Sequence, residues 1–195
     1  MERNTITGKQ SIRSKYLGYR NSLTTKERSD KSRLICECLK KQPAFAQAEA
    51  VLVYMDYRSE VMTTKLVEEL LSLGEKRIYA PKVEGMDILF YEINSLSQLE
   101  EGYQGIREPQ ICLEKMLTVE MTEHMKCLAL VPGAVFDREK DRMGYGKGFY
   151  DRFLEKYTKV TAVALAFACQ IAKKVPAEAH DRKVDMIITE NEVIL

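Results

Sequence analysis

The segment from Arg142 to Arg152, which reads Arg-Met-Gly-Tyr-Gly-Lys-Gly-Phe-Tyr-Asp-Arg, carries the strongest chemical pattern in the chain. Its three glycines alternate with other residues ahead of a predicted helix, and Lys147 lies between the last two. Glycines allow positive φ and close backbone approach, while the free N–H groups at a helix start favour anions. Together with Lys147 and Arg142, this segment predicts a site for a polyanion, most simply phosphates.

This glycine segment differs from the two common phosphate-binding motifs. Its spacing does not match a Walker A loop, and Phe149 stands where a serine or threonine would bind magnesium. The pattern Gly-x-Gly-x-x-Gly is also missing from the segment. A flexible basic surface loop is the alternative interpretation, although three glycines around a lysine are costly for a mere connector.

Two aspartates are candidates for holding magnesium beside such phosphates. Asp151 lies one turn into the predicted helix, and Asp185 precedes a predicted strand over residues 186–189. Mg²⁺ prefers one or two carboxylates together with phosphate oxygens. The alternative for Asp151 is a simple favourable interaction with the helix dipole, and for each aspartate both interpretations stay open.

The N-terminal helix predicted by the sequence carries cations beside its apolar stripe. At about 100° per residue, Lys9, Arg13 and Arg20 fall within roughly 40° of one another. The helix is either an ordinary one with a solvated basic flank or one docked with its cations toward a bound phosphate. The adjacent stripe consists of Ile12, Tyr16, Tyr19 and Leu23.

The segment after the first predicted strand carries residues that could bind a heterocyclic ligand. Glu60 could accept hydrogen bonds from the N–H groups of a heterocycle, and Met55 could pack on its face. His180 and Asp181 are neighbours in sequence, which seldom point at each other, and no serine or cysteine elbow accompanies them. We interpret this pair as structural or as supporting other residues of the site. Aromatic walls could come from Tyr54, Tyr57 and Tyr145.

Alternating strands and helices must position these residues. A helix is expected to begin at the capping box Thr24–Glu27, another over residues 63–73 with Gly74 as its cap, and a third over 149–157. Continuous apolar strands between helices predict a mostly parallel sheet covered on both faces, with ligands beyond the carboxyl ends of its strands. The predicted strands are residues 50–54, 77–80, 87–93, 126–131, 160–167 and 186–189.

Composition bounds the class of protein. The 195 residues, 45% hydrophobic and 30% charged, predict one domain over residues 1–195. With 30 Lys and Arg against 29 Asp and Glu, the net charge of +1 argues against a nucleic-acid partner. The longest apolar stretch, residues 160–168, is about half a membrane span, so no membrane association is expected. The five cysteines predict reduced thiols and a cytoplasmic location, since no N-terminal apolar segment precedes them.

The two segments at residues 132–137 and 142–151 together resemble the signature of the 5-formyltetrahydrofolate cyclo-ligases, also called 5,10-methenyltetrahydrofolate synthetases. The first reads Pro-Gly-Ala-Val-Phe-Asp and the second is the glycine segment. The resemblance covers essentially the whole chain, because further matches occur in the right order. These are Lys9-x-x-x-Arg13 with Arg20, Glu60, Ile106-Arg-Glu-Pro109 and His180-Asp181-x-x-x-Asp185.

The resemblance implies an ATP- and Mg²⁺-dependent ring closure of a small-molecule substrate, 5-formyltetrahydrofolate. The formyl oxygen would attack the γ-phosphate, and N10 would then displace phosphate to form 5,10-methenyltetrahydrofolate. Phosphoryl transfer depends on positioning and charge stabilisation, so the lack of a protein nucleophile agrees with it. The implied fold is a three-layer α/β/α sandwich with a mostly parallel, Rossmann-like sheet, and a monomer is expected, with a homodimer as the alternative.

The resemblance also implies roles for individual residues. Catalytic roles fall to Arg142, Lys147 and Tyr150, and the magnesium positions match Asp151 and Asp185. The substrate positions are Met55, Glu60, Tyr145, Gly146, Lys147, Gly148 and Phe149. The ATP positions are Lys9, Gln10, Ser11, Ile12, Arg13, Arg142, Met143, Gly144, Tyr145, Gly146, Lys147, Gly148, Phe149 and Tyr150.

Two departures from the family pattern bear on substrate affinity. Residues 139–141, Glu-Lys-Asp, occupy a stretch where the family usually has a glycine, and Phe149 replaces a common tyrosine. Two other classes remain as alternatives. One is a sugar-phosphate isomerase or coenzyme A transferase on a related sheet, and the other is a non-catalytic nucleotide- or RNA-binding module.

Overall fold

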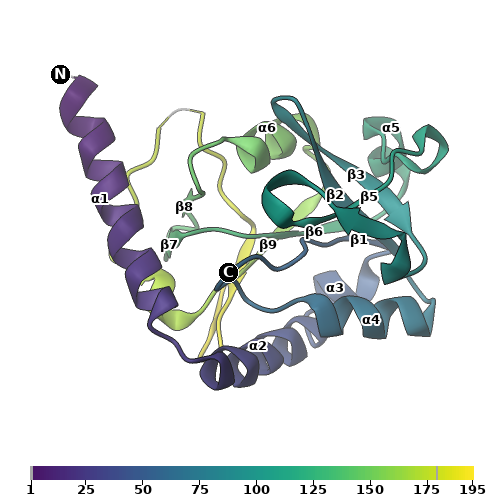
Figure 1. Ribbon diagram of the computed structural model, residues 1–195, viewed down its shortest axis with the longest axis horizontal. Coiled ribbons are helices and arrows are strands. Elements are labelled where there is room, and N and C mark those ends of the chain that lie inside the picture. The colour runs from purple at the N-terminus through teal and green to yellow at the C-terminus, as the bar shows by residue number, and fades with distance from the viewer. Residues whose placement is uncertain (1, 179) are drawn as a thin grey trace.

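The computed structural model describes residues 2–178 and 180–195 and has a twisted central sheet as its main feature (Figure 1). In the described part of the chain this sheet has seven strands in the order β12-β11-β9-β6-β1-β2-β3. The five inner strands pair in parallel, whereas β3 and β12 are antiparallel edges. The strands are β1 (Ala50–Leu52), β2 (Arg77–Glu84), β3 (Asp87–Ile93), β6 (Cys127–Val131), β9 (Thr161–Leu165), β11 (Met186–Ile188) and β12 (Val193–Ile194).

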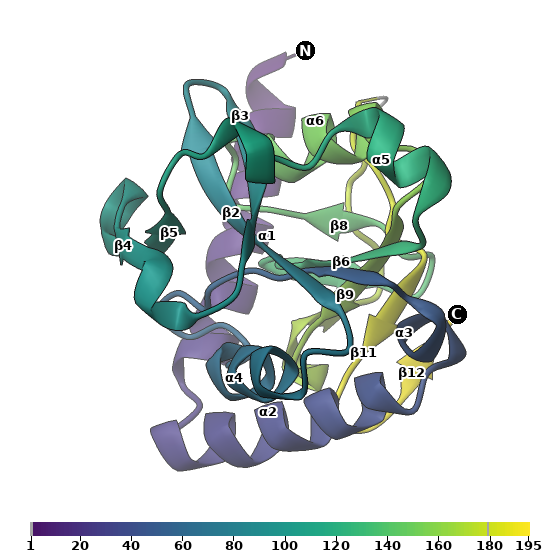
Figure 2. The ribbon, with the colours of Figure 1, turned by 90° about the vertical axis from the view of Figure 1, so that its right-hand side faces the viewer.

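Helices cover both faces of this sheet, as Figure 2 shows with α2 and α4 on one side and α5 and α6 on the other. Successive strand residues point to opposite faces, so Val51 packs with α2 and α4 while Leu52 packs with α6. The three-layer α/β/α class predicted from the sequence is therefore confirmed. The helices are α1 (Glu2–Asn21), α2 (Thr25–Lys40), α3 (Pro43–Gln47), α4 (Thr64–Leu73), α5 (Val119–His124) and α6 (Phe149–Lys156).

The first helix has a different packing partner. Rather than covering the central sheet, α1 packs on a small sheet of the order β10-β7-β8 (Figure 1). Only part of the predicted apolar stripe takes part, since Tyr19 is 46% exposed and Leu23 packs against the main core. Ile12, Tyr16 and Leu17 contact the buried residues of this small sheet. The cationic side of α1 is therefore held next to the loops that follow the main strands. The small strands are β7 (Val135–Asp137), β8 (Arg142–Met143) and β10 (Ile171–Ala172).

Several short elements were not predicted, because segments of two to six residues carry no clear period. They are β7, β8, β10 and β12, the pair β4 (Leu99–Glu101) and β5 (Arg107–Pro109), the helices α3 and α5, and short 3₁₀ turns. Two predicted strands, residues 50–54 and 160–167, extend beyond the observed ones, since β1 ends at Leu52 and β9 at Leu165. One was too short, since β2 continues to Glu84 and turns through Gly85 into β3.

The loop between β7 and β8 contains the stretch that departs from the family pattern. Lys140 adopts a φ of 67°, the left-handed region that favours glycine. The buried carboxylate of Asp137 fixes this loop by accepting hydrogen bonds from the N–H groups of Glu139 (3.0 Å), Asp141 (3.1 Å) and Val175 (2.7 Å). Asp137 is thus an anchor for the backbone that leads into Arg142.

The capping box predicted at the start of α2 is confirmed. The Thr24 hydroxyl accepts a hydrogen bond from the N–H of Glu27, whose side chain accepts one from the N–H of Thr24. Thr24→Ala is expected to lower the free energy of unfolding by about 1 kcal/mol, because one N-terminal amide loses its acceptor. Urea unfolding would measure this loss, and the exposed Ser29→Ala on the same helix should leave the midpoint unchanged.

Two further features concern membrane-spanning helices and the cysteines. Within residues 2–178 and 180–195, no helix combines the length and apolar character needed to cross a bilayer. The five cysteines are free thiols in the structure, and burial raises the pKa of Cys36 and of Cys127 to about 11 each.

Candidate active site

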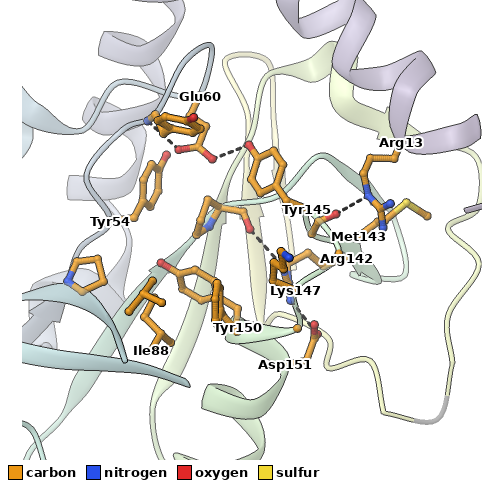
Figure 3. Close-up of a pocket in the computed structure, with 18 of the residues that line it drawn as sticks. Arg13, Tyr54, Glu60, Ile88, Arg142, Met143, Tyr145, Lys147, Tyr150 and Asp151 are labelled. Atoms are coloured by element: carbon orange, nitrogen blue, oxygen red, sulfur yellow. Dashed lines mark hydrogen bonds and ion pairs between the residues drawn. The ribbon is translucent and has the colours of Figure 1, made fainter. Parts of the chain in front are cut away.

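A cavity of about 800 Å³ lies beyond the carboxyl ends of β1 and β6 (Figure 3). Tyr54 and Met55 line it just after β1, and Pro132 lines it just after β6. Its other walls come from α1, the β2–β3 hairpin, the glycine loop over residues 144–148 and the first turn of α6. The cavity is therefore where ligands are expected in an open parallel sheet.

The structure brings most of the predicted site residues into this cavity. The exceptions are Gln10 and Ser11, which are exposed on α1, Ile12, which packs on the small sheet, and Asp185. The predicted residues that line the cavity are Lys9, Arg13, Met55, Glu60, Arg142, Met143, Gly144, Tyr145, Gly146, Lys147, Gly148, Phe149, Tyr150 and Asp151.

The glycine loop turns sharply into α6. Gly146 and Gly148 have φ values of 95° and 68°, so both adopt the backbone region that other residues rarely enter. Lys147 between them is exposed, and its ammonium group makes no hydrogen bond or ion pair with any residue that the structure describes. A cation presented in this way at a helix start is free to bind an anion.

Arg152 connects this loop to the β2–β3 hairpin. Its guanidinium group donates to the carbonyl oxygen of Lys147 (3.1 Å) and to that of Met86 at the hairpin tip, and it pairs with Asp87 (3.3 Å). A Cβ at Gly148 would lie 2.8 Å from Arg152 Nη1. The absence of a side chain at Gly148 therefore leaves room for this bridge.

Two cations of α1 reach the same cavity. Arg13 Nε donates to the carbonyl oxygen of Gly144 (2.8 Å), which ties the helix to the glycine loop. Lys9 pairs with Asp181 (2.8 Å) and Glu178 (3.1 Å). Burial alone would lower the pKa of Lys9, but these two carboxylates outweigh it and raise the pKa above its ordinary value. The helix is therefore docked with these cations at the cavity, and their contact with a bound phosphate stays a prediction.

Arg142 and Asp151 form a nearly buried ion pair at the floor of the cavity. Arg142 Nη2 lies 2.8 Å from Asp151 Oδ1, and the two side chains are only 3% and 15% exposed. The guanidinium group also lies 5.8 Å from the ring centre of Tyr150. Asp151 Oδ2 has no hydrogen-bond partner within the described chain, so one carboxylate oxygen remains available to a cation.

Asp185 does not join Asp151. Its carboxylate accepts a hydrogen bond from the N–H of Ala162 (2.7 Å), near the start of β9. That position lies at the amino ends of the parallel strands, whereas the cavity lies at their carboxyl ends. The predicted pairing of the two aspartates is therefore not formed, and the described residues contain no cluster of three or more His, Cys, Asp or Glu that could hold a metal ion.

The opposite wall of the cavity holds a buried carboxylate, Glu60. Its Oε1 accepts a hydrogen bond from the Tyr145 hydroxyl (2.5 Å), and its Oε2 accepts one from the N–H of Tyr57 (3.0 Å) (Figure 3). Burial raises the pKa of Glu60 above its ordinary value, although Tyr145 and the nearby charge of Arg20 oppose the shift.

Apolar and aromatic side chains lie around Glu60. Tyr54 is fixed by its hydroxyl, which donates to the carbonyl oxygen of Val61 (2.9 Å). Burial raises the pKa of Tyr150 above its ordinary value, so the phenol stays neutral. Phe149 packs edge-on against Tyr103, with ring centres 5.9 Å apart. One end of the cavity is thus rich in cations, and the other is flat-walled and contains the buried carboxylate of Glu60.

Sequence reasoning missed the wall formed by the β2–β3 hairpin and the β4–β5 region. A tertiary hairpin contact leaves no local signal, although the pattern Ile106-Arg-Glu-Pro109 marked part of this wall. His180, interpreted as structural, lines the cavity but is 73% exposed. The missed lining residues include Pro81, Val83, Ile88, Tyr103, Ile106 and Glu108.

The fold and the site define a Rossmann-like α/β protein with a two-sided ligand cavity at the carboxyl ends of its strands. A sequence profile of the 5-formyltetrahydrofolate cyclo-ligase family matches residues 5–190. The chain therefore belongs to this family and is an enzyme of the ligase class, as the sequence predicted. A sugar-phosphate isomerase, a coenzyme A transferase and a non-catalytic module are thereby set aside.

Individual relatives agree with this assignment. The 5-formyltetrahydrofolate cyclo-ligase of Escherichia coli K12 is 27% identical over 179 residues, which cover 89% of this chain and 96% of that protein. The enzyme of the same name from Mus musculus is 24% identical over 198 residues, 95% of each chain.

Solved structures give the same result. The 5,10-methenyltetrahydrofolate synthetase of Aquifex aeolicus superposes with a TM-score of 0.82 at 35% identity, covering 95% of this chain and 91% of that one. A synthetase from Mycoplasma pneumoniae, with a TM-score of 0.73 at 22% identity, covers 93% of this chain and 98% of its own, and shares the fold.

Proposed function

We propose that this chain converts 5-formyltetrahydrofolate to 5,10-methenyltetrahydrofolate with consumption of ATP. The observation that carries the proposal is the two-sided cavity. One wall presents Arg13, Arg142 and Lys147, while the other presents Tyr54 and the buried Glu60. A volume of about 800 Å³ lies in the upper part of the range for small-molecule sites, which leaves room for two substrates to meet in one space.

The cationic wall would bind the nucleotide. The glycine loop at residues 144–148 offers N–H groups at the start of α6, and Lys147 would contact the terminal phosphates. Arg13 is already bonded to the loop and would face the same phosphates. Gln10, Ser11 and Ile12 have no part in this proposal, because their side chains do not line the cavity.

The flat-walled end would bind the folate. Heterocyclic N–H groups need an acceptor inside an apolar slot, and Glu60 is a carboxylate in such a slot. Met55 and Tyr54 would pack on the ring faces. Phe149 adds an apolar edge, and its lack of a hydroxyl removes one possible hydrogen bond to the substrate.

The reaction needs no protein nucleophile. The oxygen of the formyl group on N5 attacks the γ-phosphorus of ATP. The bond from that phosphorus to the bridging oxygen breaks, and ADP leaves. N10 then attacks the activated formyl carbon and loses its proton to solvent, and the C–O bond breaks to release phosphate. Lys147 and Arg142 would stabilise the negative charge that develops on the transferred group, while the two walls hold the reacting atoms together.

Magnesium fits the cavity with a single protein carboxylate. Asp151 lines the wall beside Lys147, and its Oδ2 is not engaged by Arg142. One carboxylate together with phosphate oxygens is an ordinary ligand set for this ion, which would neutralise charge on the phosphates when bound. Asp151 is therefore the residue that would hold Mg²⁺, without Asp185.

The proposal also treats residues 1–195 as one working unit. The cations of α1 and the glycine loop line the same cavity, although they are more than a hundred residues apart in sequence. Action as a monomer on a small-molecule substrate is part of the proposal.

The direct test is ring closure in solution. Purified protein mixed with 5-formyltetrahydrofolate, ATP and Mg²⁺ is expected to produce the absorbance of the methenyl product. Leaving out ATP, or chelating divalent ions with EDTA, should abolish the signal, and excess Mg²⁺ should restore it. If well-folded protein gives no ATP-dependent product, the proposed function is incorrect.

A further inference from the structure

Arg20, in the last turn of α1, is the most buried cation of the cavity. Arg20 is only 2% exposed, whereas Lys9 and Arg13 on the same helix are half-buried. Its Nε donates to the hydroxyl of Ser59 (2.9 Å), and its Nη1 donates to the carbonyl oxygen of Gly133 (3.3 Å) and to the Tyr145 hydroxyl (2.6 Å). One guanidinium group thus joins the loops after β1 and β6 to the glycine loop.

The contact with Tyr145 fixes the direction of a hydrogen-bond chain. Because Arg20 can only donate, the Tyr145 oxygen accepts from it and its single proton points to Glu60 (2.5 Å). The guanidinium carbon also lies 5.6 Å from the ring centre of Tyr145, which holds the ring in place. At the end of this chain Glu60 accepts from Tyr145 through Oε1 and from the N–H of Tyr57 through Oε2, and two accepted hydrogen bonds favour the ionised form of the carboxyl.

We propose that Arg20 is a positioning residue for the folate substrate. By orienting Tyr145, it keeps Glu60 an anionic hydrogen-bond acceptor in the wall of the cavity. The proposal rests on the proposed function for the identity of the ligand. It assigns to Arg20 no contact with either substrate and no part in the transfer of the phosphoryl group.

The charges around Glu60 predict a dependence on pH. Burial raises the pKa of Glu60, whereas the Tyr145 hydrogen bond and the charge of Arg20 lower it. From the other sides Asp56 raises that pKa, and the neutral phenols Tyr54 and Tyr150 face the same region. Without Arg20 the pKa of Glu60 should therefore rise further, and as pH falls, affinity for the folate should be lost at a higher pH.

The experiment compares Arg20→Met with the wild-type protein. Binding of 5-formyltetrahydrofolate is measured by titration calorimetry without ATP over a range of pH, alongside the KM for each substrate. We expect Arg20→Met to weaken folate binding by about tenfold or more. We also expect it to move the pH midpoint of binding upward by about one unit. The KM for ATP should change much less, and Arg20→Lys should recover part of the loss.

Two further variants separate this role from a general effect on folding. Lys15→Met removes an exposed cation from the same helix and should leave the folate affinity and its pH midpoint unchanged. Tyr145→Phe removes only the connecting hydroxyl from a residue that is 44% exposed. It therefore tests the hydrogen-bond chain from Arg20 to Glu60 even if Arg20→Met fails to fold. In the Tyr145→Phe background, changing Arg20 should no longer move the pH midpoint by the same amount.

The outcomes distinguish this inference from the proposed function. A wild-type protein that neither binds nor converts 5-formyltetrahydrofolate contradicts the proposed function. A working wild-type protein whose Arg20→Met or Tyr145→Phe variant keeps the same affinity and pH midpoint overturns the role of Arg20. Equal increases in the KM for both substrates, with no movement of the midpoint, overturn it as well, because they indicate a purely structural role.

Discussion

Replacing Lys147 with alanine should lower kcat for ATP-dependent ring closure by about a thousandfold. The ammonium group is exposed between Gly146 and Gly148, whose positive φ values hold it at the start of α6. In the proposed reaction this charge acts on the transferred phosphoryl group, so its loss affects the transition state more than the bound substrates. Single-turnover measurements with the methenyl absorbance would determine the loss.

The fold should survive this substitution. The Lys147 ammonium group makes no bond to a residue that the structure describes, so the melting temperature should stay within about 1 °C of wild type. Lys159→Ala, which removes an exposed lysine just beyond α6, is the matched control and should leave both kcat and stability unchanged. Retention of wild-type kcat by Lys147→Ala would show that the glycine loop does not contact the reacting phosphate.

Replacing Arg142 with methionine should lower the free energy of unfolding. The variant leaves Asp151 without its cation, at 15% exposure, and removes the weak donor to the carbonyl oxygen of Pro132 (3.4 Å). Breaking a buried pair in this way costs about 3 kcal/mol of unfolding free energy. For a chain of this size the melting temperature should fall by about 6–12 °C. Thermal and urea unfolding would both measure it.

A second substitution isolates the ion pair from the loss of packing. In an Asp151→Asn background no uncompensated carboxylate remains, so Arg142→Met should cost clearly less than in the wild-type protein. Arg138→Met removes a guanidinium group that is 66% exposed and paired with Glu192, and it should hardly change the melting temperature. Equal losses for Arg142→Met in both backgrounds would contradict a stabilising role of the pair.

The sheet was predictable because its strands are buried on both faces. A run such as Cys127–Val131 is apolar throughout, and such runs between amphipathic helices define a parallel sheet with few alternatives. The glycine loop was predictable for a different reason. Three glycines around Lys147 ahead of a helix constrain the backbone and the charge at the same time, so local sequence alone predicted that this loop lines the cavity, and its phosphate role stays a prediction.

The rest of the site depends on tertiary contacts that leave no local signature. Arg20 was recognised as a cation beside an apolar stripe, but its partners come from loops distant in the sequence, at Ser59, Gly133 and Tyr145. Asp185 precedes a strand in a way that fits either end of the sheet, and only the parallel register with β9 assigns it to the amino end. The hairpin wall depends on the pairing of β2 with β3, which extends further than the apolar pattern.

The bridge made by Arg152 has a consequence for how the two substrates influence each other. Because it bonds the carbonyl oxygen of Lys147 and that of Met86, it ties the glycine loop to the tip of the β2–β3 hairpin. Under the proposed function, a ligand that orders either part would also order the other, so the second ligand would meet a surface whose conformational entropy is already reduced. Thermodynamic linkage makes this effect reciprocal: whichever substrate arrives first, the affinity for the other increases by the same factor.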